Sequence, residues 1–187
     1  MRKAIFNIAI EFGPIIGFLI AGELLSFINA TIVFVALTAL SLIVAYIDRK
    51  KIALFPLIAG ISIILGGVLT ITLKDPFYLI IKDTAYNGLF ALILFYGLAK
   101  NKAFLKPLFD GLFLMTDKGW RILTFRWATT FTLLTISNEI VRVLVSPEDW
   151  IVYKGLATLA TIIFALYQFK LSKKERLPEA TAWGMRA

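Results

Sequence analysis

The chain alternates between long apolar runs and short polar segments. Six runs are each long enough for a membrane-spanning helix, which needs roughly 17 to 25 residues. The first run ends at about Ile28. The other five cover Thr31 to Ile47, Ile52 to Leu73, Phe77 to Ala99, Trp120 to Val145 and Ile151 to Lys170. We interpret the first run as a retained helix, because it is longer than the apolar core of a signal peptide. The pattern predicts an all-α, polytopic transmembrane helix bundle with about six spans.

The link from Lys100 to Gly119 is the longest segment between two runs. Its apolar residues recur at helical spacing opposite Lys106 and Asp110, and they are Leu105, Leu108, Phe109 and Leu112. Such a pattern predicts a short amphipathic helix in the membrane interface, between the fourth and fifth spans. The alternative is an irregular loop, because Pro107 and Gly111 interrupt the segment.

Basic residues are unevenly distributed among the polar segments. Most Lys and Arg lie at the N-terminus, in the loop at 48–51, in the link at 100–121 and in the tail. The three intervening turns, at 29–30, 74–76 and 146–149, contain only Lys74. Because basic loops face the cytoplasm, we expect both termini to be cytoplasmic and three helical hairpins to point outward. A five-span alternative makes the first run, which contains Glu11 and Pro14, re-entrant or interfacial.

Composition supports a membrane protein and excludes several functions. Of the 187 residues, 59% are hydrophobic and 17% are charged, which is more apolar and less charged than a soluble domain. The chain contains no Cys and no His, so we expect no disulfide, no metal site, no cofactor and no enzymatic activity. The net charge of +8 comes from loops beside apolar runs, so we do not expect nucleic-acid binding. Residues 1–171 are predicted to form a single transmembrane domain, and 172–187 a basic cytoplasmic tail that is partly disordered.

Ionisable side chains inside the apolar runs are the candidate functional residues. Such groups are costly in lipid unless they are paired or hydrated. The predicted hairpins place one set at a similar depth, roughly 5 to 10 Å below the outer interface at a rise of about 1.5 Å per residue. This candidate ion network, which includes a neighbouring amide, consists of Glu23, Lys82, Asp83, Asn138, Glu139, Arg142 and Lys154. Alternatively, the basic side chains extend to the outer headgroups.

Two further groups are predicted from position. Glu11 and Arg126 lie at a similar depth below the cytoplasmic face and form a candidate inner pair. Small residues allow helices to approach closely in a membrane. The glycines predicted to serve helix packing are Gly13, Gly17, Gly60, Gly66 and Gly67.

An ordered set of short motifs resembles the intracellular septation protein A family, also called the inner membrane-spanning protein YciB family. The matching residues cover most of the chain from 12 to 168: Phe12-Gly13-Pro14, Gly66 to Thr70, Asp75, Phe77, Lys82, Leu89-Phe90-Ala91, Leu114-Met115-Thr116, Gly119-Trp120, Arg126-Trp127, Asn138-Glu139, Trp150, Lys154, Phe164-Ala165 and Gln168. Departures at Asp83, at Val143 after Arg142, and at 155–157 indicate a divergent member.

The resemblance implies a protein of the bacterial inner membrane that supports envelope integrity, septation and division. It implies other inner-membrane division or envelope-synthesis proteins as partners, besides the lipid bilayer, and no catalytic activity. A second copy of the chain is a further candidate partner, through the glycine-rich faces. The alternative function is a small transporter or lipid-handling protein that uses the ion network in the outer half of the bundle.

Overall fold

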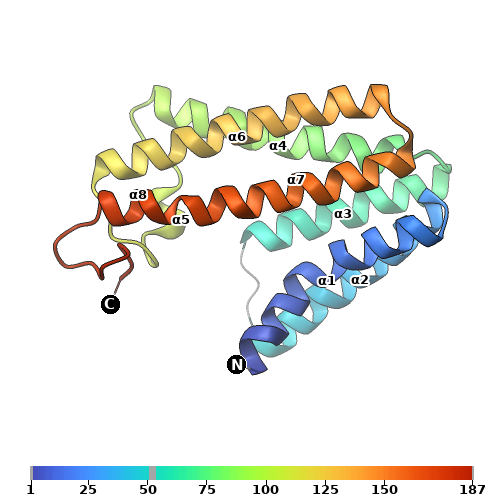
Figure 1. Ribbon diagram of the computed structural model, residues 1–187, viewed down its shortest axis with the longest axis horizontal. Helices are drawn as coiled ribbons and strands as arrows, with labels where there is room; N and C mark the ends of the chain where they lie inside the picture. Colours follow the sequence, from blue (N-terminus) through green and yellow to red (C-terminus); the bar gives the residue numbers. More distant parts are fainter. Residues whose placement is uncertain (1, 51–53, 187) are drawn as a thin grey trace. The chain divides into compact units, whose positions relative to one another are not determined.

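The structure is a computed structural model that describes residues 2–50 and 54–186. Within these ranges it contains eight helices and no strand, which confirms the predicted all-helical class. The helices are α1 (Arg2–Leu24), α2 (Phe27–Arg49), α3 (Leu54–Leu73), α4 (Phe77–Ala99), α5 (Lys106–Phe109), α6 (Asp117–Leu144), α7 (Pro147–Tyr167) and α8 (Phe169–Lys174) (Figure 1). The predicted start of the third run, at Ile52, lies outside the described residues.

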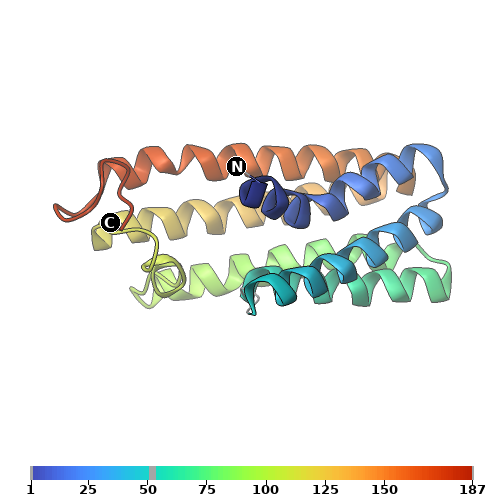
Figure 2. The same ribbon diagram turned by 90° about the horizontal axis from the view of Figure 1, so that it is seen from below.

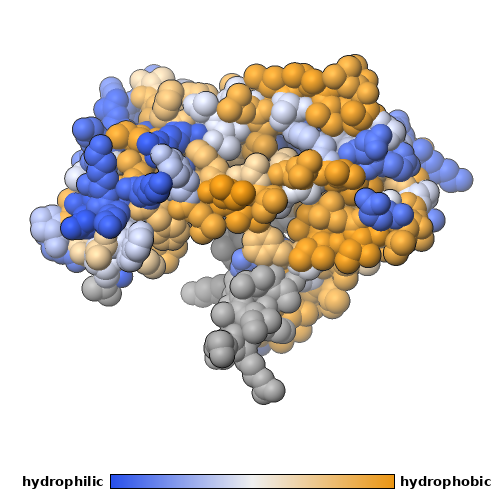
Figure 3. All heavy atoms as spheres, in the orientation of Figure 1, coloured by the Kyte–Doolittle hydropathy of each residue, from blue (hydrophilic) through white to orange (hydrophobic). Residues whose placement is uncertain are grey.

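Three helical segments of the described chain are long and apolar enough to cross a membrane. They are Phe27–Asp48, Phe77–Ala99 and Pro147–Lys174, and a shorter apolar helix covers Leu57–Leu73. Many of their large apolar side chains stay exposed, as lipid-facing side chains do, and apolar residues cover much of the helix surface in Figure 3. The chain is therefore a membrane protein with several apolar helices, whereas the six-span topology stays a prediction.

The first turn is four residues earlier than predicted. α1 ends at Leu24 and α2 begins at Phe27, with Ser26 in an extended conformation at the N-cap position. The predicted turn residues Asn29 and Ala30 therefore lie inside α2. The physical reason is packing, because Phe27 and Ala30 are both buried in an aromatic core. Burial of Phe27 and Ala30 in this core outweighs the preference of Asn29 for a turn.

The link between α4 and α6 contains less helix than predicted. α5 is a single turn, and the rest of the link is irregular, with turns and two isolated bridge residues, as expected for the irregular alternative. Pro107 lies in the first turn of α5, where its missing N–H costs nothing. Lys106 donates a hydrogen bond of 2.6 Å to Asp117 at the start of α6, and this bond holds the pKa of Asp117 below its usual value.

The chain divides into two compact units. Unit 1 comprises Met1–Tyr86 and Asn138–Gly155, and unit 2 comprises Asn87–Ser137 and Leu156–Ala187. The tail after residue 171 belongs to unit 2 together with the link, and the division into a transmembrane domain and a tail stays a prediction.

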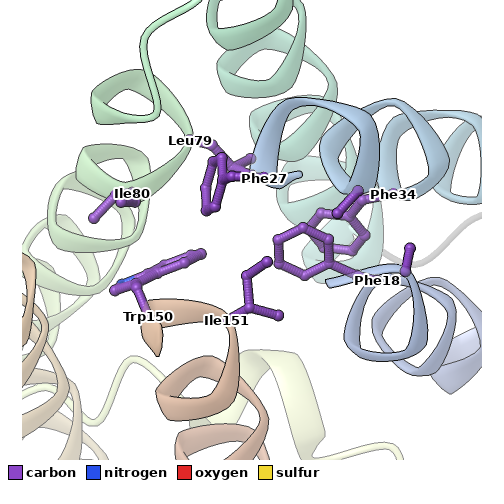
Figure 4. Packing of buried hydrophobic residues seen from close by; sticks show 9 residues of the cluster. Phe18, Phe27, Phe34, Leu79, Ile80, Trp150 and Ile151 are labelled. Carbon is purple, nitrogen blue, oxygen red and sulfur yellow. The ribbon is translucent and has the colours of Figure 1, made fainter. Parts of the chain in front are cut away.

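Unit 1 is built on helix pairs and an aromatic core. α1 packs against α2, and α2 packs against α3 (Figure 2). In the core the rings of Phe18 and Phe34 stack with centroids 4.6 Å apart, and Phe18 also meets Phe27 and Trp150 edge to face. Figure 4 shows Trp150 and Ile151, from the start of α7, pointing towards these phenylalanines. The core thus joins the start of α7 to the α1–α2 hairpin.

Four of the five predicted packing glycines lie against neighbouring helices of unit 1. A methyl group added to Gly17, Gly60 or Gly67 would meet a leucine or valine side chain of α2. One added to Gly66 would meet the Tyr78 carbonyl oxygen at 3.0 Å. Gly13 differs, because an added methyl group there would meet nothing within 4 Å. Close approach of α3 to both α2 and α4 therefore depends on small residues, as in other membrane helix pairs.

In unit 2 the tail folds back onto the link. Met115 pairs with Arg176, and Phe113 pairs with Met185, each in an antiparallel bridge. Beneath this pairing, Trp120 and Leu171 are buried in a second hydrophobic cluster. Described residues of the tail, for which we predicted partial disorder, have these backbone partners.

Candidate functional site

The turn between α3 and α4 fixes the start of α4. Asp75 accepts a hydrogen bond of 2.9 Å from the backbone N–H of Phe77. The hydroxyl of Thr70 accepts one of 2.9 Å from the N–H of Leu79. Both contacts satisfy N–H groups that the first turn of a helix leaves without partners. The side chains one turn further along α4, which carry the charges, are thereby held in place.

Asn138 of α6 is the centre of a buried hydrogen-bond cluster. Its side chain is 2% exposed. Its amide donates to the carbonyl oxygen of Ile80, at 3.1 Å, and to the hydroxyl of Thr84, at 2.9 Å. Its carbonyl oxygen accepts a bond of 2.8 Å from the indole nitrogen of Trp150. One amide therefore connects α4, α6 and α7 within unit 1.

Asp83 of α4 lies between two lysines. Its carboxylate pairs with Lys82 through one oxygen and with Lys154 of α7 through the other. The three side chains are only 8 to 23% exposed, so the ions are largely removed from solvent. Buried ions of this kind stabilise a fold only when each has a partner. This triad carries a net formal charge of +1.

Glu139 and Arg142 form a second ion pair one helical turn apart on α6. Nη2 of Arg142 lies 2.6 Å and Nε lies 3.1 Å from the same carboxylate oxygen. The other oxygen of Glu139 accepts a hydrogen bond from the hydroxyl of Thr84, at 2.5 Å. The pair is more accessible than the triad, with 34% of Glu139 and 27% of Arg142 exposed.

The structure thus brings together six of the seven residues of the predicted ion network. Glu23 differs from the prediction, because its side chain is exposed and it forms no ion pair with any described residue. The reason is the earlier turn. α1 ends at Leu24, which puts Glu23 in the last turn of the helix rather than well inside it.

The predicted inner pair falls in different units, Glu11 in unit 1 and Arg126 in unit 2, so that pairing stays a prediction. Within unit 2, Arg126 donates a hydrogen bond of 3.1 Å to the side-chain oxygen of Gln168. Its guanidinium also lies 5.9 Å from the ring centre of Tyr167. The amide nitrogen of Gln168 in turn donates to the Phe164 carbonyl oxygen, at 2.9 Å. A neutral amide therefore serves as the partner of this arginine.

Sequence reasoning missed Thr84 and did not predict the polar role of Trp150. Most threonines of the helices, such as Thr31 and Thr124, donate their hydroxyl hydrogen to the carbonyl four residues earlier. Thr84 instead bridges Asn138 and Glu139. Nothing in its sequence context distinguishes it from the others. A hydrogen-bond acceptor for Trp150 could have been predicted, since a buried indole N–H needs one.

The arrangement consists of paired charges and hydrogen-bond partners. All buried side-chain nitrogen and oxygen atoms in the described part of the chain have partners. The residues that the structure describes contain no group of three His, Cys, Asp or Glu side chains placed to hold a metal ion. We therefore define the polar layer as Lys82, Asp83, Thr84, Asn138, Glu139, Arg142, Trp150 and Lys154.

Comparison with known proteins identifies relatives along almost the whole chain. A model of the family "Intracellular septation protein A" matches residues 6–178. The inner membrane-spanning protein YciB of Bradyrhizobium sp. (strain BTAi1) is 35% identical over 171 residues, which cover 91% of this chain and 86% of the relative. That of Afipia carboxidovorans is 33% identical over 179 residues, 95% of this chain and 90% of the relative.

A third relative, from Brucella melitensis biotype 1, is 33% identical and is aligned over 94% of this chain and 96% of its own length. No solved structure matches the chain significantly. The relatives are named for spanning the inner membrane, and the family is named for septation. With the ordered motifs and the apolar helices, these matches show that the chain belongs to the intracellular septation protein A family of inner membrane-spanning proteins.

Proposed function

We propose that the chain is a structural and interaction protein of the bacterial inner membrane, without catalytic activity, that supports envelope integrity, septation and division. Family membership supports the cellular process. The observation that carries the molecular role is the polar layer, in which Asn138 and the Asp83 triad tie three helices together through fully partnered groups. Such a layer suits a rigid scaffold, because breaking any member leaves a buried polar group without a partner.

The test is complementation in cells that lack the chain. Wild-type chain should restore normal cell length and resistance to osmotic shock, and a chain with Asn138→Leu, expressed at the same level, should restore them less. The proposal fails if removal of the chain changes neither septum placement nor osmotic resistance. Cross-linking from a photoreactive residue at Lys102, which is exposed, should capture division or envelope-synthesis proteins.

The proposed topology has six spans in three outward-pointing hairpins, with cytoplasmic termini and with the α5 region in the membrane interface. Six helices of twenty or more residues support it, as does the distribution of basic residues. Because the chain has no cysteine, single cysteines report topology without background. An impermeant thiol reagent should label Glu148→Cys from outside intact spheroplasts and Lys102→Cys only after lysis. The reverse pattern, or labelling of both, contradicts the topology.

A homodimer is an additional proposal. Of the five predicted packing glycines, only Gly13 is open to a second chain, since the other four face helices of the same unit. Substitution of Gly13 by Leu should therefore lower any dimer fraction measured by single-molecule photobleaching in bilayers. An unchanged dimer fraction would exclude this face.

A small transporter or lipid-handling protein is the second candidate function. The observation in its favour is the partial exposure of Glu139 and Arg142, which leaves an ion pair accessible near the end of α6. In proteoliposomes, Glu139→Gln should then abolish solute flux or lipid transfer without loss of folded protein. If the wild-type chain mediates neither process, the scaffold remains as the function.

A further inference from the structure

The tail and the link form a structured surface that the polar layer and the proposed scaffold do not use. We call it the clasp, defined as residues 105–116 and 169–186. Four backbone hydrogen bonds connect its two segments. In each, a backbone N–H donates to a carbonyl oxygen: Leu114 to Gly184 (2.8 Å), Thr116 to Glu175 (2.8 Å), Leu177 to Leu114 (3.0 Å) and Arg186 to Leu112 (2.9 Å). These bonds give the tail a defined position on the link.

Side chains and one glycine reinforce the clasp. The Ser172 hydroxyl donates to the carbonyl oxygen of Trp183 at 2.8 Å. Gly184 follows with a φ of 74°, a conformation that favours glycine, and an added methyl group would collide with the Ser172 backbone. The Thr116 hydroxyl donates to the Glu175 carboxylate at 2.9 Å. These contacts fix which side chains the clasp presents outward.

Four large apolar side chains of the clasp are exposed. Leu108 is 45%, Leu112 56%, Trp183 54% and Met185 41% exposed. The pairing of Arg186 with Leu112, and of Met185 with Phe113, brings the tail residues beside those of the link. Apolar side chains gathered in a clasp of fixed geometry are costly in water and indicate a surface that is covered in use.

The clasp and the adjoining helix ends are strongly basic. Residues 100–121 and 170–186 together contain ten Lys or Arg but only four Asp or Glu. The basic residues are Lys100, Lys102, Lys106, Lys118, Arg121, Lys170, Lys173, Lys174, Arg176 and Arg186, and the acidic ones are Asp110, Asp117, Glu175 and Glu179. Hydrophilic residues gather around α5, α8 and the tail in Figure 3, with apolar patches among them.

Position settles what covers this surface. The candidate membrane span Phe77–Ala99 is followed by the link, and the candidate span Pro147–Lys174 ends within the clasp, at its residues 169–174. The clasp therefore lies where a membrane helix leaves the lipid. Tryptophan is enriched at that depth, and a basic surface with apolar side chains is the composition of segments that bind anionic headgroups.

We propose that the clasp binds the anionic lipid headgroup surface of the bilayer that its own helices span. Trp183, Leu112 and their neighbours enter the interface, while the surrounding lysines and arginines contact lipid phosphates. This inference rests on the proposed topology, which already places the α5 region in the membrane interface, but it does not depend on a role in septation. It would hold for a scaffold and for a transporter alike.

The test uses the full-length chain with a single cysteine at Ala182, an exposed residue beside Trp183, labelled with bimane. The labelled chain is placed in nanodiscs of phosphatidylcholine alone or mixed with phosphatidylglycerol. In the anionic discs we expect acrylamide quenching to fall at least about twofold, and high salt to reverse the change. Acrylamide is neutral, so disc charge does not alter its local concentration.

Two variants and one control complete the experiment. Trp183→Ser should restore strong quenching through loss of insertion, and Lys173→Gln with Lys174→Gln should weaken the lipid dependence. A label at Glu148→Cys, in the first turn of α7 and outside the clasp, should be quenched equally in both discs. Trypsin digestion shows that the variants keep the tail in place, since cleavage after Arg176 should stay slow.

Equal, strong quenching at residue 182 in both kinds of disc would overturn the proposal, because the clasp would then face water. Equal protection in both would overturn the preference for anionic lipid. Protection that appears only when membrane proteins are added would assign the surface to a protein partner instead.

Discussion

Replacing Asn138 by Leu tests whether the polar layer stabilises the fold. Leucine has the same number of side-chain heavy atoms as asparagine, with the same branching, and cannot hydrogen-bond, so the change removes the three hydrogen bonds that Asn138 makes. Side-chain hydrogen bonds between membrane helices contribute about 0.6 kcal/mol on average and up to about 1.7 kcal/mol each. The three together give roughly 2 to 5 kcal/mol. The upper part of this range is favoured, because the indole N–H of Trp150 loses its acceptor in an apolar core.

The measurement is reversible unfolding in mixed micelles with increasing dodecyl sulfate, followed by far-UV circular dichroism. The matched control is Asn87→Leu on α4. Asn87 is half-buried, and its side chain has no hydrogen bond with any described residue. We expect the control to change the free energy of unfolding by no more than about 0.5 kcal/mol.

A double-mutant cycle separates the hydrogen bond from general packing. Trp150→Phe keeps an aromatic ring in the core and removes the indole N–H that Asn138 accepts together with part of the ring volume, so its packing loss is measured by the single mutant. The coupling energy between Asn138→Leu and Trp150→Phe should be about 0.6 to 1.7 kcal/mol. Additive effects, or a loss below about 0.5 kcal/mol for Asn138→Leu alone, would refute the reasoning that this amide joins three helices.

Three further predictions concern other parts of the chain. Asp83→Asn leaves two buried ammonium groups without their carboxylate, so the same titration should show a loss of about 3 to 5 kcal/mol; adding Lys154→Met should recover part of it, and no recovery would contradict the triad. Gly67→Leu places a side chain against Val35 of α2 and should lower the unfolding midpoint, whereas Gly13→Leu in the monomer should not. Gly184→Ala should loosen the clasp and speed tryptic cleavage after Arg176, because alanine is strained at the positive φ of this position. An unchanged cleavage rate would argue against that strain.

The sequence allowed the meeting of charged side chains from α4 and α7, next to those of α6, to be predicted. Lys82, Asp83 and Lys154 each lie a fixed number of residues from a turn, and the rise of a helix converts that number into depth. Glu23 shows that this reasoning depends on placing the turn correctly. Its turn was placed at Asn29 by residue preference, whereas burial of Phe27 moves the turn to residues 25–26, and the depth of Glu23 changes with it.

The clasp was not predictable, because its contacts join residues about sixty or seventy positions apart. The tail sequence is charged and contains no apolar run, which is also the composition of a disordered segment. What orders it is backbone pairing with the link and the close approach of Gly184 to Ser172, and neither leaves a periodic signal. Helix positions follow from local pattern, but pairing between irregular segments does not.

Trp150 explains why the polar layer and the aromatic core of unit 1 occur together. Its ring packs 6.1 Å from the ring of Phe27 and 6.5 Å from that of Phe18, while its nitrogen donates to Asn138. Lipid gives little hydrophobic driving force for helix association, so a membrane bundle relies on packing and hydrogen bonds. One side chain that serves both couples the α1–α2 hairpin to α4 and α6. Loss of either contact should therefore weaken the other, which is why Trp150→Phe and Asn138→Leu are expected to be non-additive while Asn87→Leu is silent.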